Sequence, residues 1–338
     1  LKKVVEGHDL NEHEAYNAIN EIMTGQAADV HIAGFLIALR MKGESVEEIL
    51  GGTRALAEKA NRISPKVGLC VDPVGTGGDG TQTFNISSAS ALLAAASGAH
   101  VAKHGNRSIS SQSGSADFYE SIGININLSP KAVEKCIEDT GFGFMYAPNF
   151  HPAMRFAGPI RRQLGVRNIF NILGPLSNPA GAQAQVLGVY DKSLMPFIAQ
   201  TLQRLGEVHA LVVHSADGAD EIMNTGETYI LDVFRDRIEE YTISAEDFGM
   251  TSYTLKDLAG GTPQENVQIV LDIFNGKKGP CRDVVVLNAA ATLYAANIEP
   301  SIKDAVSRVC KALDSGKAME KLEEIRLYTQ EHADESVS

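Results

Sequence analysis

In residues 1–66 of the amino-acid sequence, apolar residues recur at helical spacing between short polar segments. Two polar pairs in this region have the spacing of capping boxes, in which side chain and backbone close the first turn of a helix. These pairs are Asn11 with Glu14 and Ser45 with Glu48. Ser64-Pro65 interrupts the pattern, because the residue before a proline avoids helical geometry. The pattern predicts a small N-terminal domain of consecutive helices.

Beyond residue 66 the period of the pattern changes. Short runs rich in β-branched residues alternate with longer helical patterns, which predicts βα units around a largely parallel sheet. The predicted strands cover residues 69–74, 99–102, 186–190 and 208–213, and the predicted helices include 89–97 and 194–205. We expect an α/β fold, with a helical domain over 1–66 and an α/β domain over 67–338 whose mainly parallel central sheet is flanked by helices. The acidic end after Thr329 is expected to fray.

Composition and charge narrow the classes of function. A formal net charge of −12 argues against nucleic acid or an anionic membrane as a partner, because such binding needs clustered Lys and Arg. No stretch approaches the roughly 20 apolar residues of a membrane span. The four cysteines have no metal-ligand spacing, as in a reduced intracellular protein. We expect a cytoplasmic protein in which any phosphate site is local.

The glycine-rich segment Gly75–Gly80 (GTGGDG) follows a predicted strand and precedes a predicted helix. It satisfies the dinucleotide fingerprint GxGxxG, but residues 101–104 (VAKH) stand where that fingerprint expects an acidic residue. A nicotinamide cofactor is therefore disfavoured. Glycines allow backbone N–H groups to approach an anion, so we interpret the segment as a polyphosphate cradle, with a tight turn before a helix as the alternative. Asp79 fits this cradle if it faces sugar hydroxyls or a hydrated cation.

Two further loops carry candidate chemistry. Residues 103–108 (KHGNRS), which continue into a hydroxyl-rich stretch up to Asp117, combine cations with many donors that could wrap a pyrophosphate. The alternative is a solvated polar loop. After the buried strand 210–213, the loop 214–221 ends in Asp220-Glu221. Two carboxylates plus substrate phosphates suffice for Mg²⁺, although an adjacent acidic pair is also common on surfaces.

Five segments together carry a resemblance to a known family. They are Gly75–Ser88, Lys103–Asp117, His151–Met154, Asn171–Pro179 (NILGPLSNP) and Asp220-Glu221. Their sequences and their order resemble those of the anthranilate phosphoribosyltransferases. The similarity runs from the N-terminal helices to Leu287–Ala291 and so covers nearly the whole chain. The departures are mild: Ser88 for a frequent Thr, Ser215 for a frequent Gly and Ala219 for a frequent Leu.

The resemblance implies a magnesium-dependent pentosyltransferase of tryptophan biosynthesis. Such an enzyme transfers the phosphoribosyl group of 5-phosphoribosyl 1-pyrophosphate (PRPP) to the amine of anthranilate, which gives N-(5-phosphoribosyl)anthranilate and pyrophosphate. It also implies two Mg²⁺ ions when PRPP is bound, and a homodimer formed through the helical domain together with a returning segment near 158–178. The fold would be that of the nucleoside phosphorylase-like phosphoribosyltransferases.

The resemblance assigns site residues as well. The residues implied for PRPP are Gly75, Gly78, Asp79, Thr83, Asn85, Ile86, Ser87, Ser88, Lys103, His104, Gly105, Asn106, Arg107, Ser108, Ile109, Ser110, Ser111 and Ser115. Those implied for anthranilate are Gly75, His104, Asn106, His151 and Arg161, and those for the metal are Ser87, Asp220 and Glu221. Either Arg161 or Arg162 could pair with a carboxylate in a bidentate way, and the resemblance favours Arg161.

No residue is assigned as a definite general base. An aromatic amine is largely neutral at pH 7, so it needs orientation more than deprotonation, and His104 is a candidate acceptor for the proton that it releases. Two other functions remain as alternatives. A pyrimidine nucleoside phosphorylase has a related fold but different glycine-loop and basic-loop signatures. A non-enzymatic, nucleic-acid-binding relative would need a basic surface, against which the net charge weighs.

Overall fold

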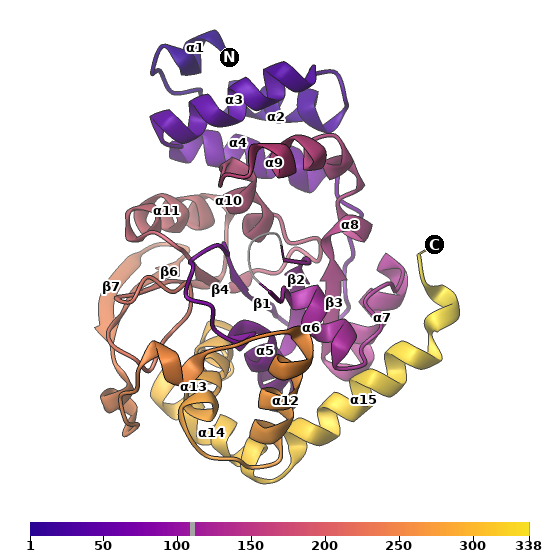
Figure 1. Cartoon of the computed structure of the whole chain (residues 1–338), viewed down its shortest axis with the longest axis vertical. Helices are drawn as coiled ribbons and strands as arrows, with labels where there is room; N and C mark the ends of the chain where they lie inside the picture. Colours follow the sequence, from indigo (N-terminus) through magenta and orange to yellow (C-terminus); the bar gives the residue numbers. More distant parts are fainter. Residues whose placement is uncertain (109–111, 338) are drawn as a thin grey trace.

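The predicted N-terminal helices are present in the computed structural model, which describes residues 1–108 and 112–337. They are α1 (Lys2–Val5), α2 (Glu12–Met23), α3 (Asp29–Lys42) and α4 (Val46–Glu58). Both predicted capping boxes are confirmed, because Asn11 and Ser45 each accept the N–H of the glutamate three residues later. These helices form the upper layer of the molecule (Figure 1).

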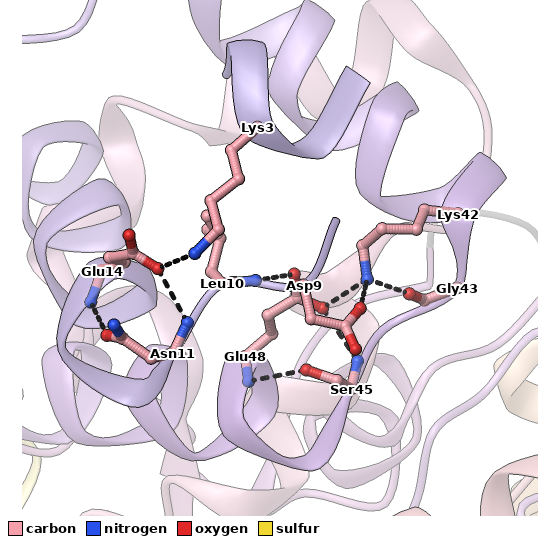
Figure 2. A network of polar contacts seen from close by, with 9 residues as sticks. All are labelled: Lys3, Asp9, Leu10, Asn11, Glu14, Lys42, Gly43, Ser45 and Glu48. Atoms are coloured by element: carbon pink, nitrogen blue, oxygen red, sulfur yellow. Dashed lines mark hydrogen bonds and ion pairs between the residues drawn. The ribbon is translucent and has the colours of Figure 1, made fainter. Parts of the chain in front are cut away.

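A buried charge network ties the starts and ends of these helices together (Figure 2). The Lys42 ammonium donates to Glu48 at 2.9 Å, to Asp9 at 2.6 Å and to the Gly43 carbonyl at 2.6 Å. Glu48 also accepts the backbone N–H groups of Leu10 and Ser45, at 3.0 and 2.8 Å. Burial alone would lower the pKa of Lys42, but its hydrogen bonds to Asp9 and Glu48 raise that pKa above its usual value. The network is thus internally neutralised.

The central sheet has seven strands in the order β3-β2-β1-β4-β5-β6-β7. The strands are β1 (Cys70–Gly75), β2 (His100–Gly105), β3 (Phe142–Tyr146), β4 (Ala184–Gly188), β5 (His209–Ser215), β6 (Thr228–Phe234) and β7 (Ile238–Ile243). The first five are parallel, while β6 and β7 pair antiparallel at one edge. The predicted α/β class with a mainly parallel sheet is confirmed.

Helices cover both faces of the five parallel strands, which are largely buried, whereas the edge strand β7 exposes Glu239 and Glu240. In β5, Leu211 and Val213 join the core beneath the sheet in Figure 1, and Ala210 and Val212 join the core on the opposite face. The lower core includes α5 (Ile86–Ala96), α6 (Ser115–Ser121), α12 (Pro263–Phe274), α13 (Pro280–Ala295), α14 (Ile302–Asp314) and α15 (Lys317–Glu331). The remaining helices are α7 (Pro130–Thr140), α8 (Ala147–Phe150), α9 (Gly158–Leu164), α10 (Ile169–Leu176) and α11 (Met195–Leu205).

The chain returns to the N-terminal helices through α9 and α10, which lie directly beneath them in Figure 1. Ile160 of α9 and Phe170 and Leu173 of α10 share one apolar cluster with Phe35 of α3 and Leu56 of α4. The same cluster continues onto one face of the sheet. The helical layer is therefore packed onto the α/β layer through a continuous core.

The expectation that the chain frays after Thr329 is wrong. Helix α15 continues to Glu331, Ser336 forms a β-bridge with Leu128, and the Val337 N–H donates to the Asn127 carbonyl at 2.7 Å. The polar, acidic composition of this segment suggested that it frays. Instead, its backbone is hydrogen bonded to residues 127 and 129, which are distant in the sequence. Within residues 1–108 and 112–337, no helix is long and apolar enough to cross a membrane.

Candidate active site

The predicted site loops meet at one edge of the sheet. Strands β1, β2, β4 and β5 are parallel neighbours, so their carboxyl ends share that edge, where ligands of such sheets bind. These strands end at Gly75, Gly105, Gly188 and Ser215. The glycine loop, the basic loop and the acidic loop, far apart in the sequence, thereby become adjacent.

The glycine loop packs directly on the acidic loop. The Gly77 N–H donates to Asp220 Oδ2 at 2.6 Å, and the Thr76 N–H donates to the Gly188 carbonyl at 2.9 Å. A Cβ atom at Gly75 would lie 2.4 Å from Asp220 Oδ2, and one at Gly188 would lie 1.6 Å from the Asp220 carbonyl oxygen. Both strands therefore need glycine where Asp220 passes over their ends.

The rest of the glycine loop leads into α5. Asp79 accepts the Thr81 hydroxyl at 2.6 Å, and Thr83 forms a β-bridge with Ala259. The Asn85 side chain is fixed by Asn266, whose amide donates to it at 2.8 Å. The predicted residues thus line the approach to the start of α5.

In the first turn of α5, Ser87 faces the site, whereas its neighbours Ile86 and Ser88 are buried. The Ser87 N–H points to the site and donates to Glu221 Oε1 at 3.1 Å. Ile86 and Ser88 are buried, and the Ile86 N–H already donates to the Phe84 carbonyl at 2.7 Å. Ser87 is therefore the residue of this turn that reaches the acidic pair.

Among the described residues, Lys103 is the buried cation beside the acidic pair. Asp220, Glu221 and Ser87 line a small cavity together with Asn288, whose side chain is hydrogen bonded to both the N–H and the carbonyl of Ile222. Burial raises the pKa of Asp220 and of Glu221, with further contributions from Asp79 to the former and from Asp220 to the latter. Lys103 donates to the Pro73 carbonyl at 2.6 Å, and burial lowers its pKa against the opposing effect of Asp72, Glu221 and Asp220.

This donor set fits a hard divalent cation. Mg²⁺ prefers oxygen ligands and commonly takes one or two carboxylates with substrate phosphates completing its shell. Within the described ranges, no three His, Cys, Asp or Glu side chains are placed to hold an ion by themselves. Asp220, Glu221 and the Ser87 hydroxyl would therefore supply only part of a coordination shell. An added positive charge would oppose both the burial and the carboxylate repulsion that raise the pKa values of Asp220 and Glu221.

A set of buried hydrogen bonds centred on Asp72, called the Asp72 brace below, lies beneath this site and was not predicted from the sequence. Asp72, in the middle of β1, is 0 % exposed; its Oδ1 accepts the His104 N–H at 3.3 Å and its Oδ2 accepts the Asn178 amide at 2.7 Å. Burial raises the pKa of Asp72 to about 6, while Lys103 opposes the shift. A lone charge within an apolar strand was the available signal, as was Asn178 inside NILGPLSNP. The Asp72 brace fixes the backbone from which Lys103 and His104 project.

The basic loop is oriented toward α6. The Arg107 guanidinium donates to Asp117 and Glu120 at 2.8 Å each, and Ser108 and Gly114 donate their N–H groups to Asp117. The Ser115 hydroxyl donates to the Asn106 carbonyl at 3.3 Å. Arg107 is thus not brought to the acidic pair, and its predicted phosphate contact requires it to exchange these partners. Three predicted residues, Ile109, Ser110 and Ser111, lie outside the described residues.

Among the described residues, several buried polar atoms of the predicted acceptor residues have no close hydrogen-bond partner. The rings of His104 and His151 are 4.9 Å apart between centroids, and these atoms include His104 Nε2 and both His151 ring nitrogens. Burial lowers the pKa of His104 well below its usual value and that of His151 to about 4, so both rings are neutral at pH 7. Arg161 stacks at 5.4 Å on the Phe170 ring, and its Nε has no partner. Burial lowers its pKa to about 10, which leaves it charged, whereas Arg162 is exposed.

Comparison with known families gives two consecutive matches. The model described as "Glycosyl transferase family, helical bundle domain" matches residues 1–60, and the model described as "Glycosyl transferase family, a/b domain" matches residues 68–319. Together they span most of the chain. The division between them falls at the predicted break near Ser64-Pro65.

Individual proteins give the same result. An anthranilate phosphoribosyltransferase of Clostridium kluyveri is 50% identical over 328 residues, which cover 97% of this chain and 98% of that protein. The crystal structure of the Thermus thermophilus anthranilate phosphoribosyltransferase superposes with a TM-score of 0.92 at 42% identity, covering 97% and 98% of the two chains. The Saccharomyces cerevisiae enzyme superposes with TM-scores of 0.88 in its complex with PRPP and Mg and 0.86 in its complex with 4-fluoroanthranilate. These matches have 26% and 25% identity and cover 95% of this chain and 94% of the yeast chain.

Proposed function

The chain belongs to the anthranilate phosphoribosyltransferases within the glycosyl transferase family, and from this premise we propose how its residues divide the reaction. The reaction joins PRPP to the amine of anthranilate, releases pyrophosphate and serves tryptophan biosynthesis. Full-length identity of 50% to such an enzyme favours this function over the nucleoside phosphorylase and nucleic-acid-binding alternatives. The observation that carries the division of roles is the meeting of an acidic cavity and a glycine loop at one sheet edge, where Gly77 donates to Asp220 and Ser87 donates to Glu221.

PRPP binds at the glycine and basic loops in this proposal. Gly77 and the neighbouring amides would face the pyrophosphate or the ribose, and Lys103 lies beside the acidic pair to compensate its charge. Asp220, Glu221 and Ser87 would hold magnesium, which when bound neutralises charge on the pyrophosphate. Two ions per site are proposed, as the resemblance implies. The yeast relative in complex with PRPP and Mg supports the use of these two ligands.

Anthranilate binds on the side of His104 and His151 in this proposal. The Arg161 guanidinium would pair with the carboxylate of anthranilate, because no acidic residue within the described ranges neutralises it. Stacking on the Phe170 ring keeps the guanidinium oriented. Neutral His104 has a free Nε2 that can accept a hydrogen bond from the amine. The yeast relative in complex with 4-fluoroanthranilate supports an acceptor pocket of this kind.

The transfer needs positioning more than base strength. The amine nitrogen bonds to the anomeric carbon, the bond from that carbon to the pyrophosphate oxygen breaks, and the nitrogen loses one proton. Positive charge develops on the ribose and negative charge on the leaving group, so preorganised amides and Lys103 stabilise the transition state. His104 is the residue placed to take the proton, because burial keeps its ring neutral.

The assembly is proposed to be a homodimer through the helical domain, 1–66 with the returning segment near 158–178. Helices α1 and α3 carry three strongly exposed apolar side chains: Val5 is 67 % exposed, Val30 73 % and Met41 83 %. A protein interface would cover such side chains. A cytoplasmic location remains a prediction.

The fluorescence of anthranilate on mixing protein, PRPP and Mg²⁺ tests the proposed function. We expect magnesium-dependent loss of fluorescence, and severe loss of activity in Asp220→Ala/Glu221→Ala. Glu239→Ala/Glu240→Ala is the matched control, because it removes an adjacent acidic pair that is exposed on β7. No consumption by folded parent protein would contradict the activity, and equal activity in both double variants would remove only the metal assignment.

A further inference from the structure

Arg167, in the turn between α9 and α10, reaches across to the glycine loop. Its guanidinium lies 3.9 Å from the centroid of the Tyr190 ring, and its Nη1 donates to the Gly78 carbonyl at 2.7 Å. Its Cδ lies 3.5 Å from where a Cβ of Gly78 would stand, so side chain and loop are in van der Waals contact. Within residues 1–108 and 112–337 no carboxylate pairs with Arg167, so its contacts with loop and ring are the ones that fix it.

Tyr190 is itself anchored on two sides. Its hydroxyl accepts a hydrogen bond from Arg40 of α3 at 3.2 Å, and its backbone N–H donates to the Thr76 hydroxyl at 3.1 Å. The ring therefore stands between the helical layer and the start of the glycine loop. A contiguous chain of contacts runs from Arg40 through Tyr190 and Arg167 to Gly78.

The glycine loop needs an external support. Gly77, Gly78 and Gly80 have φ values of 68°, 73° and 81°, a backbone region that glycine adopts easily. Fixing a glycine in one conformation costs more conformational entropy than fixing any other residue. The other side-chain support is Asp220, which accepts the Gly77 N–H and is also a proposed metal ligand. The hydrogen bond from Gly77 to Asp220 would change when Asp220 binds a metal ion. The hydrogen bond from Arg167 to the Gly78 carbonyl does not involve Asp220.

We propose that Arg167 is a positioning residue for PRPP: stacked on Tyr190, it holds the Gly78 carbonyl and so sets the loop amides before substrate arrives. The inference rests on the proposed function, since it assumes that this loop receives PRPP. The planar guanidinium can stack on the ring and donate in its own plane at the same time, which a lysine ammonium cannot. Arg167→Lys is therefore expected to rescue only part of the effect of Arg167→Ala.

The direct test is hydrogen–deuterium exchange of the substrate-free protein over residues 76–82. Arg167→Ala should speed exchange of this segment about tenfold, with Arg167→Lys in between, because a stacked cation and one hydrogen bond together hold the loop. Arg237→Ala is the matched control, since Arg237 also stacks at 3.9 Å on an aromatic ring, Phe234, but at the far β6–β7 edge. Exchange over residues 76–82 should not respond to that change.

The kinetic test separates the two substrates. Arg167→Ala should raise the KM for PRPP about tenfold and change the KM for anthranilate less than twofold. A raised KM for PRPP with unchanged exchange would overturn the inference in favour of direct contact between Arg167 and substrate. Equal loss for both substrates would also overturn it. If the parent protein consumes no anthranilate, the proposed function fails, whereas the exchange result still tests the support of the loop.

Discussion

Two clusters of charged side chains in this molecule differ in how far their charges are compensated, one around the buried Glu48 and one around the half-buried Asp220 and Glu221. In the helical layer, Glu48 meets Lys42 and two backbone N–H groups, and the pKa of Lys42 is raised by its carboxylate partners. At the sheet edge, Asp220 and Glu221 lie beside Lys103, which donates a hydrogen bond to a carbonyl. Burial raises the pKa of both carboxyl groups, with a further contribution from Asp79 to Asp220 and from Asp220 to Glu221. One cluster is complete within the chain, and the other has excess negative charge.

The difference separates structural charge from functional charge. A buried carboxylate costs free energy unless donors or cations satisfy it, and the Glu48 network meets that cost with its own residues. The chain itself offsets only part of the free-energy cost of desolvating Asp220 and Glu221. Binding of a cation at this pair should therefore raise the free energy of unfolding. The acceptor side repeats this pattern with the opposite sign, because no carboxylate among residues 1–108 and 112–337 pairs with the half-buried Arg161, whose Nε has no hydrogen-bond partner there.

The largest effect is expected at the acidic pair. Asp220→Asn/Glu221→Gln should lower turnover about 10³-fold, or about 4 kcal/mol, because the stabilisation of the leaving group is lost. The same variant should be more stable than the parent in the absence of metal, because repulsion between carboxylates is removed. Thermal unfolding with and without Mg²⁺ measures both effects. If the variant is less stable than the parent and is still stabilised by Mg²⁺, the proposed difference between the two charge clusters is wrong.

The Glu48 network should respond in the reverse sense. Glu48→Ala leaves Lys42 and two buried N–H groups short of an acceptor and should lower the free energy of unfolding by about 3 kcal/mol. The KM values of the folded fraction should stay within twofold. Glu47→Ala is the control, since it breaks only an exposed pair with Arg204, worth less than about 1 kcal/mol. Urea unfolding compares them, and equal losses would contradict the role of the network.

Arg161 tests the unpaired cation on the acceptor side. Arg161→Ala should raise the KM for anthranilate about 30-fold, or about 2 kcal/mol, because a charge-assisted bond to the carboxylate is lost. The KM for PRPP should change little, which is the reverse of the result expected for Arg167→Ala. Arg162→Ala, at the exposed neighbouring position, should leave both values unchanged. Comparable increases in both KM values for Arg161→Ala would rule out the assigned role.

Glu207, a half-buried acid, offers a smaller, pH-dependent effect. Burial, with a contribution from Asp72, raises its pKa from 4.5 to about 8, and its Oε2 has no hydrogen-bond partner among the described residues. Because the folded pKa is the higher one, its contribution to stability is complete below pH 4.5 and is lost as the pH rises through 8. Between pH 6 and pH 9 the parent should lose about 2 kcal/mol more unfolding free energy than Glu207→Gln. Parallel losses in urea unfolding would show that Glu207 titrates normally.

Much of the architecture could be predicted from the sequence. Capping-box spacing located the starts of α2 and α4, and short apolar runs located β1, β4 and β5 to within two residues. These features are local, so a single segment carries the signal. The prediction for the C-terminus failed because hydrogen bonds to residues 127 and 129 lie outside any local pattern.

The candidate site divides in the same way. The sequence by itself determined which loops carry glycines, cations and carboxylates, because residue type and spacing limit what a loop can bind. Only the tertiary structure decided which charges are compensated. Arg107 pairs with Asp117, Arg161 meets no acid in the described part of the chain, and Asp72 accepts the His104 N–H. Each of these outcomes depends on distances between segments that share no sequence pattern. Burial and neighbouring charge, which set the pKa of each group, exist only after the strands have brought these loops to one edge of the sheet.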